Sequence, residues 1–186
     1  MNTSIRKGPF KFIESQKIYQ NPWITLREDK VIRPGDKEGI FGVIEMKSGS
    51  SVLALTNDNQ VMLVKEYKYG IEQETIETIS GALEVNETPL QAAKREFKEE
   101  LGVEAKEWVS FGVVNPFTTV VKSPNYMFLA MGIKEMGEPN PDDGEVIEMV
   151  KIPFQTAFEM VIKSEITHSA SCVLILKAFY HLKKEL

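Results

Sequence analysis

Alternating apolar and polar residues near the start of the chain predict a small antiparallel β-meander. Residues 9–20 and 22–33 alternate in this way, and the turn signals Asn21-Pro22 and Pro34-Gly35-Asp36 separate and end them. A further strand is predicted across 38–47. Such a meander has two faces and little core of its own, so we expect it to pack on the main domain or on another copy of the chain.

Two nearly continuous apolar runs, 51–57 and 60–67, predict a hairpin around Asn57-Asp58-Asn59. Because both runs are apolar throughout, we expect these strands at the centre of a sheet that is covered on both faces. Further strands are predicted at 107–114, 125–133 and 146–152.

Apolar residues at helical spacing predict a helix from Pro89 to Leu101. Thr88 is a natural N-cap, Gln91 completes a capping box with it, and Gly102 suits the left-handed residue that ends a helix. The residues expected on the apolar face of this helix are Leu90, Ala93, Phe97 and Leu101.

Two amphipathic helices are predicted at the end of the chain, over 153–164 and 169–186. The second is expected to place four residues on one face, namely Cys172, Ile175, Leu176 and Phe179. Strands, then a helix, strands again and two helices indicate an α+β fold with helices packed around a mixed sheet.

The composition excludes several classes of function. The 186 residues include 22 basic and 27 acidic side chains, and the net charge of −5 argues against a general binder of nucleic acid or anionic membranes. Cys172 is the single cysteine, so no intrachain disulfide can form, and its apolar surroundings predict a buried, inert thiol. We expect a cytoplasmic protein, since we find neither a signal peptide nor the ~20 apolar residues of a membrane span.

Three glutamates gather on the helix at 89–101. At ~100° per residue, Glu96 and Glu100 lie on one side, and Glu99 borders the same stripe. Glu100 lies closest to the apolar face, so we expect this cluster at the edge of the core, with Arg95 bracing Glu99. Carboxylates at such spacing repel one another, and Mg²⁺, which prefers oxygen ligands, would remove that conflict.

An alternative is that Lys94 and Lys98 neutralise these acids on a solvated face. The longer segment favours the metal interpretation, because it combines Gly81, Glu87, the acidic helix and Gly102 at a defined spacing that ends at Val103. This segment resembles the Nudix box of the Nudix hydrolases at each defining position. The resemblance implies an α/β/α sandwich around a mixed sheet and a strand–loop–helix that binds Mg²⁺, or Mn²⁺ in its place.

The resemblance also assigns roles to the residues of the box. It implies that Glu96 and Glu100 bind the metal directly, with Glu99 as a further ligand or a ligand of a second ion. The carbonyl of Ser80 is implied as a backbone ligand. Arg95 and Glu87 are implied as supports that lock the loop to the helix.

The chain is most similar to the branch of ADP-ribose pyrophosphatases, which implies hydrolysis of a nucleoside diphosphate sugar, ADP-ribose first. Lys68 and Glu77 occupy places where that branch contacts substrate, although the family usually has arginine at the first. The alternative for Lys68 is a solvated lysine at a strand end. Pro116 and Pro124 both depart from the branch's usual proline spacing, so GDP-mannose, other sugar nucleotides and dinucleotides stay open. A non-catalytic nucleotide-sensing module is a further alternative, but such modules usually lose box acids.

The N-terminal meander carries an expectation of its own. Relatives with such an extension are typically homodimers, so residues 1–47 are interpreted as a dimerising β subdomain and 48–186 as the Nudix domain. From the first of these, Trp23 and Arg27 could reach a nucleobase. The alternative for Trp23 is simple packing in a core.

The resemblance implies that an acid on the loop at 137–145 acts as the general base or as an extra metal ligand, because related enzymes place such an acid there. Glu145 is the candidate, ahead of Asp143 and Asp142, and solvated loop acids are the alternative. Glu99 and Glu100 are the other carboxylates that could take a proton from water.

Overall fold

The computed structural model describes residues 5–140 and 146–183 and divides them into two compact units. The first unit contains residues 5–47 together with Asn115–Ser123. The second contains Ser48–Val114 and the described residues from Pro124 onward. The sequence pattern did not predict that residues 115–123 group with the N-terminal meander.

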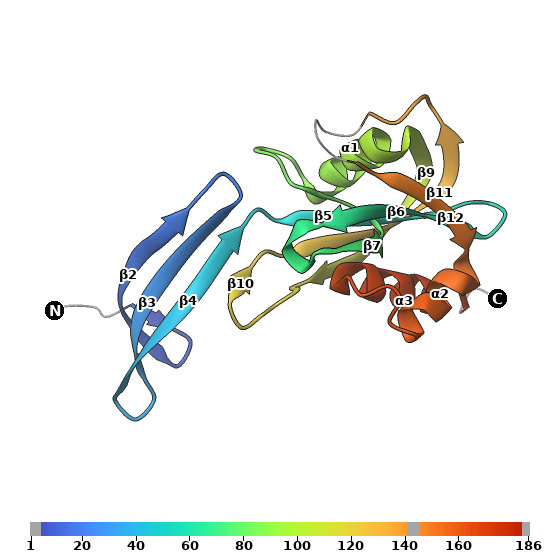
Figure 1. Ribbon diagram of the computed structural model, residues 1–186. Helices are drawn as coiled ribbons and strands as arrows, with labels where there is room; N and C mark the ends of the chain where they lie inside the picture. Colours follow the sequence, from blue (N-terminus) through green and yellow to red (C-terminus); the bar gives the residue numbers. More distant parts are fainter. Residues whose placement is uncertain (1–4, 141–145, 184–186) are drawn as a thin grey trace. The chain divides into compact units, whose positions relative to one another are not determined.

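The first unit is a five-stranded sheet in the order β1-β2-β3-β4-β10 (Figure 1). Its strands are β1 (Arg6–Lys7), β2 (Phe10–Gln20), β3 (Ile24–Arg33), β4 (Lys37–Met46) and β10 (Val121–Lys122). The first four pair antiparallel, as the alternating pattern predicts, whereas β10 pairs parallel with β4. The chain returns to this sheet after the end of the box region, which local pattern alone does not reveal.

This sheet has little apolar core within one chain. Val31 is the only apolar side chain that is buried among the described residues of the unit. Beside it, the buried carboxylate of Asp29 accepts hydrogen bonds from Arg27 and, at 2.8 Å, from Lys7. Burial alone would raise the pKa of Asp29, but the hydrogen bonds from Arg27, Lys7 and Ser15 hold it well below its ordinary range.

The second unit is built on a mixed seven-stranded sheet in the order β12-β6-β5-β11-β9. Its strands are β5 (Gly49–Leu55), β6 (Gln60–Lys68), β7 (Gln73–Glu77), β8 (Ile79–Ala82), β9 (Val103–Val114), β11 (Asn125–Glu135) and β12 (Glu148–Pro153). β5 and β11 run parallel, and the remaining pairs are antiparallel. The predicted hairpin at 51–67 is confirmed, and β5 is buried along nearly its whole length.

Helices cover both faces of this sheet (Figure 1). Two apolar clusters fill the space between the layers. The helices are α1 (Pro89–Leu101), α2 (Phe154–Ile162) and α3 (Ser169–Lys183), with the 3₁₀ turn η1 (Tyr69–Ile71) between β6 and β7. One cluster packs under α1 around Phe97, and the other packs under α2 and α3 around Leu174. The predicted α/β/α sandwich is therefore confirmed.

The central strands separate where the site is built. β5 and β6 pair only at Ala54–Met62 and Leu55–Val61, and the chain from 73 to 82 fills the gap beyond. Its first part, β7, pairs with β6, and its second part, β8, pairs with β5. Thr78 is the residue between them, and it is fully buried. The sheet therefore divides at Thr78, next to the start of the box.

Helix α1 begins and ends as the sequence predicts. Thr88 accepts a hydrogen bond from the Gln91 backbone N–H, the capping box is complete, and Gly102 is left-handed with φ of +65°. The predicted face of α3 is partly wrong, because Leu176 is 38% exposed. Nearly every residue of that segment is apolar, so periodicity could not choose the face. The buried side chains of α3 are Ala170, Ser171, Leu174, Ile175 and Ala178.

Candidate active site

Strand β8 and helix α1 bring Gly81 into direct contact with Glu96. A Cβ atom on Gly81 would lie 1.8 Å from the Glu96 carboxyl carbon, a distance that no side chain tolerates. The constraint on this glycine is a close approach rather than its backbone angles. A side chain here would force the Glu96 carboxylate away from the strand.

Arg95 ties the loop before α1 to the helix. Its Nε and Nη2 donate to the two carboxylate oxygens of Glu87 at 3.0 and 3.1 Å, and Nη2 also donates to the Ala82 carbonyl at 3.0 Å. Its Nη1 donates to Glu96 at 2.8 Å and to Glu99 at 2.9 Å. The pKa of Arg95 is raised strongly by these carboxylates, with Glu87 first, and Arg95 in turn lowers the pKa of Glu87. One guanidinium thus fixes three carboxylates.

The three helix glutamates differ in exposure. The side chains of Glu96 and Glu99 are 17% and 36% exposed, and Glu100 is 8% exposed as a residue. The prediction that Glu100 lies nearest the core is confirmed, and so is the contact between Arg95 and Glu99. The cluster lies at the edge of the core, where opposite charge stabilises carboxylates more than it would in open water.

The helix glutamates are the candidate ligands of a metal ion. Among the described residues, no group of three carboxylate, histidine or cysteine side chains converges tightly enough to form a ready cage. Arg95 explains this, because its Nη1 draws oxygens of Glu96 and Glu99 toward itself. The donors are nonetheless hard oxygens at the end of one helix, which suit Mg²⁺ with several retained waters. The metal roles of Ser80, Glu96, Glu99 and Glu100 stay predictions.

Ser80 lies on β8, opposite Ser51 of β5. Its hydroxyl lies 2.8 Å from the Ser51 hydroxyl and donates to the Thr78 carbonyl at 3.0 Å. These bonds tie the Ser80 side chain to β5 and to Thr78. The side chain of Ser80 is therefore occupied within the sheet, in keeping with a role for its carbonyl rather than its hydroxyl.

The last turn of α1 anchors the chain that follows β11. The Gly102 carbonyl accepts hydrogen bonds from the backbone N–H groups of Met136 and Gly137, and the Glu99 carbonyl accepts one from Asn140 at 2.8 Å. A Cβ atom on Gly102 would lie 2.3 Å from the Gly137 carbonyl oxygen. The chain is thereby fixed beside the acidic helix up to residue 140.

Three candidates for the general base lie on the segment that follows. Asp142, Asp143 and Glu145 fall outside the described residues. Their role stays a prediction, as does the alternative role of Glu99 and Glu100.

Lys68 and Glu77 lie together at the divided part of the sheet. Lys68 ends β6, and its Nζ hydrogen-bonds Glu66 and lies 4.0 Å from Glu77 Oε2. Burial alone would lower the pKa of Lys68, but Glu66, Glu77 and Glu100 reverse this and raise it. Lys68 is thus paired with acids at the end of its strand, and 38% of its side chain is exposed. Substrate contact by Lys68 and Glu77 stays a prediction.

Sequence reasoning missed His168 and Ser171. His168 precedes α3, and its Nδ1 lies 3.2 Å from Glu77 Oε2 and 2.8 Å from the Ser171 hydroxyl. Ser171 accepts the Thr78 backbone N–H at 2.9 Å. No local signal reveals these contacts, because α3 reaches Thr78 and Glu77 from the far end of the chain.

The two predicted substrate contacts of the first unit behave differently. Trp23 is 74% exposed, so the alternative that it packs in a core of this chain is wrong. Arg27 donates to Asp29 and lies 3.5 Å from Glu45, so its charge is already balanced within the sheet. A role for either residue in substrate binding stays a prediction.

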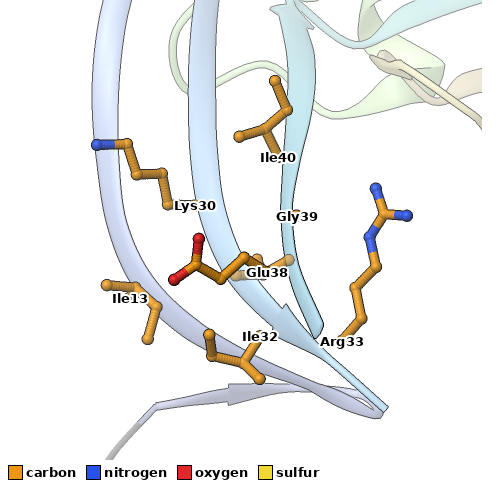
Figure 2. Close-up of a pocket in the computed structure, with 8 residues that line it drawn as sticks. Ile13, Lys30, Ile32, Arg33, Glu38, Gly39 and Ile40 are labelled. Carbon is orange, nitrogen blue, oxygen red and sulfur yellow. The ribbon is translucent and has the colours of Figure 1, made fainter. Parts of the chain in front are cut away.

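A groove runs along the sheet of the first unit (Figure 2). Apolar residues of three strands, Ile13, Ile32 and Ile40, line it together with charged groups, and Ile13 and Ile40 are 50% and 57% exposed. The remaining lining residues are Lys30, Val31, Arg33, Glu38 and Gly39.

Comparison with known families fits this geometry. The family model described as the nucleoside diphosphate sugar hydrolase N-terminal domain matches residues 10–44, and the model described as the NUDIX domain matches residues 47–169. The chain belongs to the Nudix family. Members of this family generally use divalent metal ions. None of the helices in the described part of this Nudix chain is long and apolar enough to cross a membrane.

Individual proteins resemble this Nudix chain along most of its length. It is 26% identical to an ADP-ribose pyrophosphatase of Bacillus subtilis (strain 168), over 84% of this chain and 85% of that protein. It is 25% identical to an ADP-ribose pyrophosphatase of Mycobacterium tuberculosis (strain ATCC 25618 / H37Rv), over 90% and 82%. It is 24% identical to a methanol dehydrogenase activator of Bacillus methanolicus, over 89% and 90%.

A solved structure described as an ADP compounds hydrolase has the same fold. It superimposes with a TM-score of 0.84 and covers 99% of this chain and 98% of its own, at 16% sequence identity. At that identity the likeness concerns the fold alone. It extends over both units of the chain.

Proposed function

We propose that this Nudix protein is a pyrophosphohydrolase that cleaves the diphosphate of a nucleoside diphosphate sugar, with ADP-ribose as the first candidate. The observation that carries the proposal is the complete box, in which Arg95 locks Glu87 to the helix and Glu96 lies against Gly81. The N-terminal nucleoside diphosphate sugar hydrolase domain and the two ADP-ribose pyrophosphatase relatives support this class of substrate.

The metal of the proposed reaction is Mg²⁺, with Mn²⁺ as a substitute. Glu96, Glu99, Glu100 and the Ser80 carbonyl would hold it. A bound divalent cation offsets diphosphate charge and lowers the pKa of a coordinated water. Arg95 donates to both Glu96 and Glu99, so it would restrict the conformations of these two candidate ligands before an ion binds. This pre-positioning reduces the entropy that binding would otherwise cost.

The remaining residues bind substrate or move protons. Lys68 would contact the diphosphate as a point charge, since an ammonium lacks the forked geometry of arginine. Glu145 would take the proton from the attacking water, with Asp143, Asp142, Glu99 and Glu100 as the other candidates.

The N-terminal unit would complete the site in a homodimer. Its sheet buries only Val31 among the described apolar side chains and leaves Ile13, Ile40 and Trp23 exposed. A second copy would cover such a surface, and Trp23 and Arg27 would then be candidates for contacts with the nucleobase. A cytoplasmic location and the lack of nucleic-acid and membrane partners stay predictions.

A panel of substrates tests the proposal. ADP-ribose, GDP-mannose, another sugar nucleotide and a dinucleotide are incubated with the protein and Mg²⁺, with Mn²⁺, or with a chelator. Mass analysis of the products in ¹⁸O-labelled water identifies both the cleaved compound and the attacked phosphorus. Metal-dependent release of two monophosphates from a sugar nucleotide supports the proposal. Binding without turnover across the whole panel would favour the sensing module instead.

A further inference from the structure

A buried polar contact holds the point where the central sheet divides. At Thr78 the chain stops pairing with β6 and begins to pair with β5, so the Thr78 backbone N–H needs a partner outside the sheet. Ser171 of α3 supplies that partner through its hydroxyl oxygen, at 2.9 Å, and the two hydroxyls lie 3.0 Å apart. Both residues are fully buried, so water cannot substitute for this contact.

The hydrogen-bond pattern assigns the proton of His168. Its Nδ1 faces two groups, the Glu77 carboxylate at 3.2 Å and the Ser171 hydroxyl at 2.8 Å. A carboxylate only accepts, and Ser171 can direct its single hydrogen to Thr78. A proton on Nδ1 can be donated to Ser171, and it avoids placing a ring lone pair 3.2 Å from the Glu77 carboxylate, so we infer that Nδ1 carries the proton. In the neutral ring, Nε2 is then the nitrogen that titrates.

Glu77 is held at both of its oxygens. Thr75 donates its hydroxyl hydrogen to Oε1 at 2.7 Å, and His168 approaches Oε2. The same Oε2 lies 4.0 Å from the ammonium of Lys68. The ammonium of Lys68 also hydrogen-bonds Glu66, and the Glu77 oxygen that lies near it is the one that His168 approaches.

We propose that His168 is a positioning residue: its Nδ1, which hydrogen-bonds Ser171 and lies 3.2 Å from Glu77, holds the Glu77 carboxylate so that Lys68 is directed at the substrate diphosphate. This inference rests on the proposed function, because it assumes a diphosphate at Lys68. Protonation of Nε2 would place a second cation beside Glu77, in competition with Lys68. Among the described residues, the charged groups that act on the ring are Glu77 from β7 and Lys68 from β6.

Two isosteric amides distinguish positioning from simple packing. Asparagine places an N–H where Nδ1 lies, and glutamine places its amide near Nε2. We expect His168→Asn to bind imidodiphosphate, an analogue that is not hydrolysed, within about threefold of the natural protein. We expect His168→Gln and His168→Ala to bind it about tenfold more weakly. His181→Asn, which changes the other histidine of the chain, is the matched control and should bind normally.

The binding measurement is made by calorimetry in Mg²⁺ at pH 8, with circular dichroism to confirm folding of each variant. Long-range ¹H–¹⁵N spectra of the natural protein report directly which ring nitrogen of His168 carries the proton. Equal affinity in His168→Asn and His168→Gln, or a proton on Nε2 alone, would overturn the inference. Because neither measurement needs turnover, the inference can fail while the proposed function holds. If the substrate panel shows no hydrolysis, the proposed function is rejected, while the measured affinities and the position of the ring proton remain valid.

Discussion

Gly81 and Glu96 approach so closely that any side chain at position 81 would occupy the space of the Glu96 carboxylate. This contact joins the end of strand β8 to the middle of helix α1, and it sets the direction of the Glu96 side chain. Backbone on one side and Arg95 on the other leave Glu96 little freedom.

Gly81→Ala is therefore expected to displace Glu96 without unfolding the protein. A displacement of about 1 Å at a catalytic group can lower kcat/KM about a hundredfold. Steady-state rates over a range of Mg²⁺ concentrations would show the loss, together with a higher metal requirement. Gly70→Ala is the matched control, because a Cβ atom there meets nothing within 4 Å. Equal losses in the two variants would contradict the assignment.

Glu100→Gln keeps the size of the side chain and removes its charge. If Glu100 binds the metal, turnover should fall at least about a hundredfold while the fold stays intact. Rates are compared with the thermal midpoint of each variant. Glu104→Gln, at an exposed glutamate that pairs with Lys98, serves for comparison and should turn over normally. Near-normal turnover in Glu100→Gln would refute the metal assignment.

Arg95→Lys tests the lock between loop and helix. Lysine keeps the positive charge but cannot donate to both oxygens of Glu87 and to Glu96 and Glu99 together. We expect the free energy of unfolding to fall by about 1–2 kcal/mol and kcat to fall at least tenfold. Urea denaturation and initial rates measure the two effects. The same exchange at Arg6, which is exposed in β1, should leave both unchanged, and an equally mild result at Arg95 would argue against the lock.

The parts of the molecule that local pattern determines were predictable. Capping residues fixed both ends of α1, and a continuous apolar run placed β5 at the centre of the sheet. What the pattern could not reveal depends on contacts between distant segments. β10 is too short to show any alternation, and the approach of His168 to Glu77 joins residues that no spacing rule connects.

The titration of His168 should make the stability of the protein depend on pH. Burial lowers its pKa below the ordinary value of 6.5, Glu77 opposes this, and Lys68 adds to the lowering. The unfolded chain therefore binds a proton that the folded chain does not, between the lowered pKa and 6.5. Stability should fall as pH drops through this window and should level off below it.

Urea denaturation across that pH range measures the effect. His168→Asn cannot titrate, so its stability should lose this component and vary less with pH than that of the natural protein. His181→Asn is the comparison, because that ring packs edge-on against Phe111 rather than against Glu77. Parallel pH curves for the natural protein and His168→Asn would show that the ring titrates alike in both states.

Gly102→Ala is expected to be the most destabilising of the glycine changes. The residue has φ of +65°, which costs a side chain about 1–2 kcal/mol, and its Cβ atom would lie 2.3 Å from the Gly137 carbonyl oxygen. Relief requires the chain at 136–140 to move away from the last turn of α1, which breaks its hydrogen bonds to Gly102 and Glu99. We expect a loss of about 2–4 kcal/mol in the free energy of unfolding, measured in urea. Gly137→Ala changes the other side of the same contact, where a Cβ atom meets nothing within 4 Å, and should cost far less. Similar losses in the two variants would mean that the backbone contact at Gly102 is not what fixes this turn.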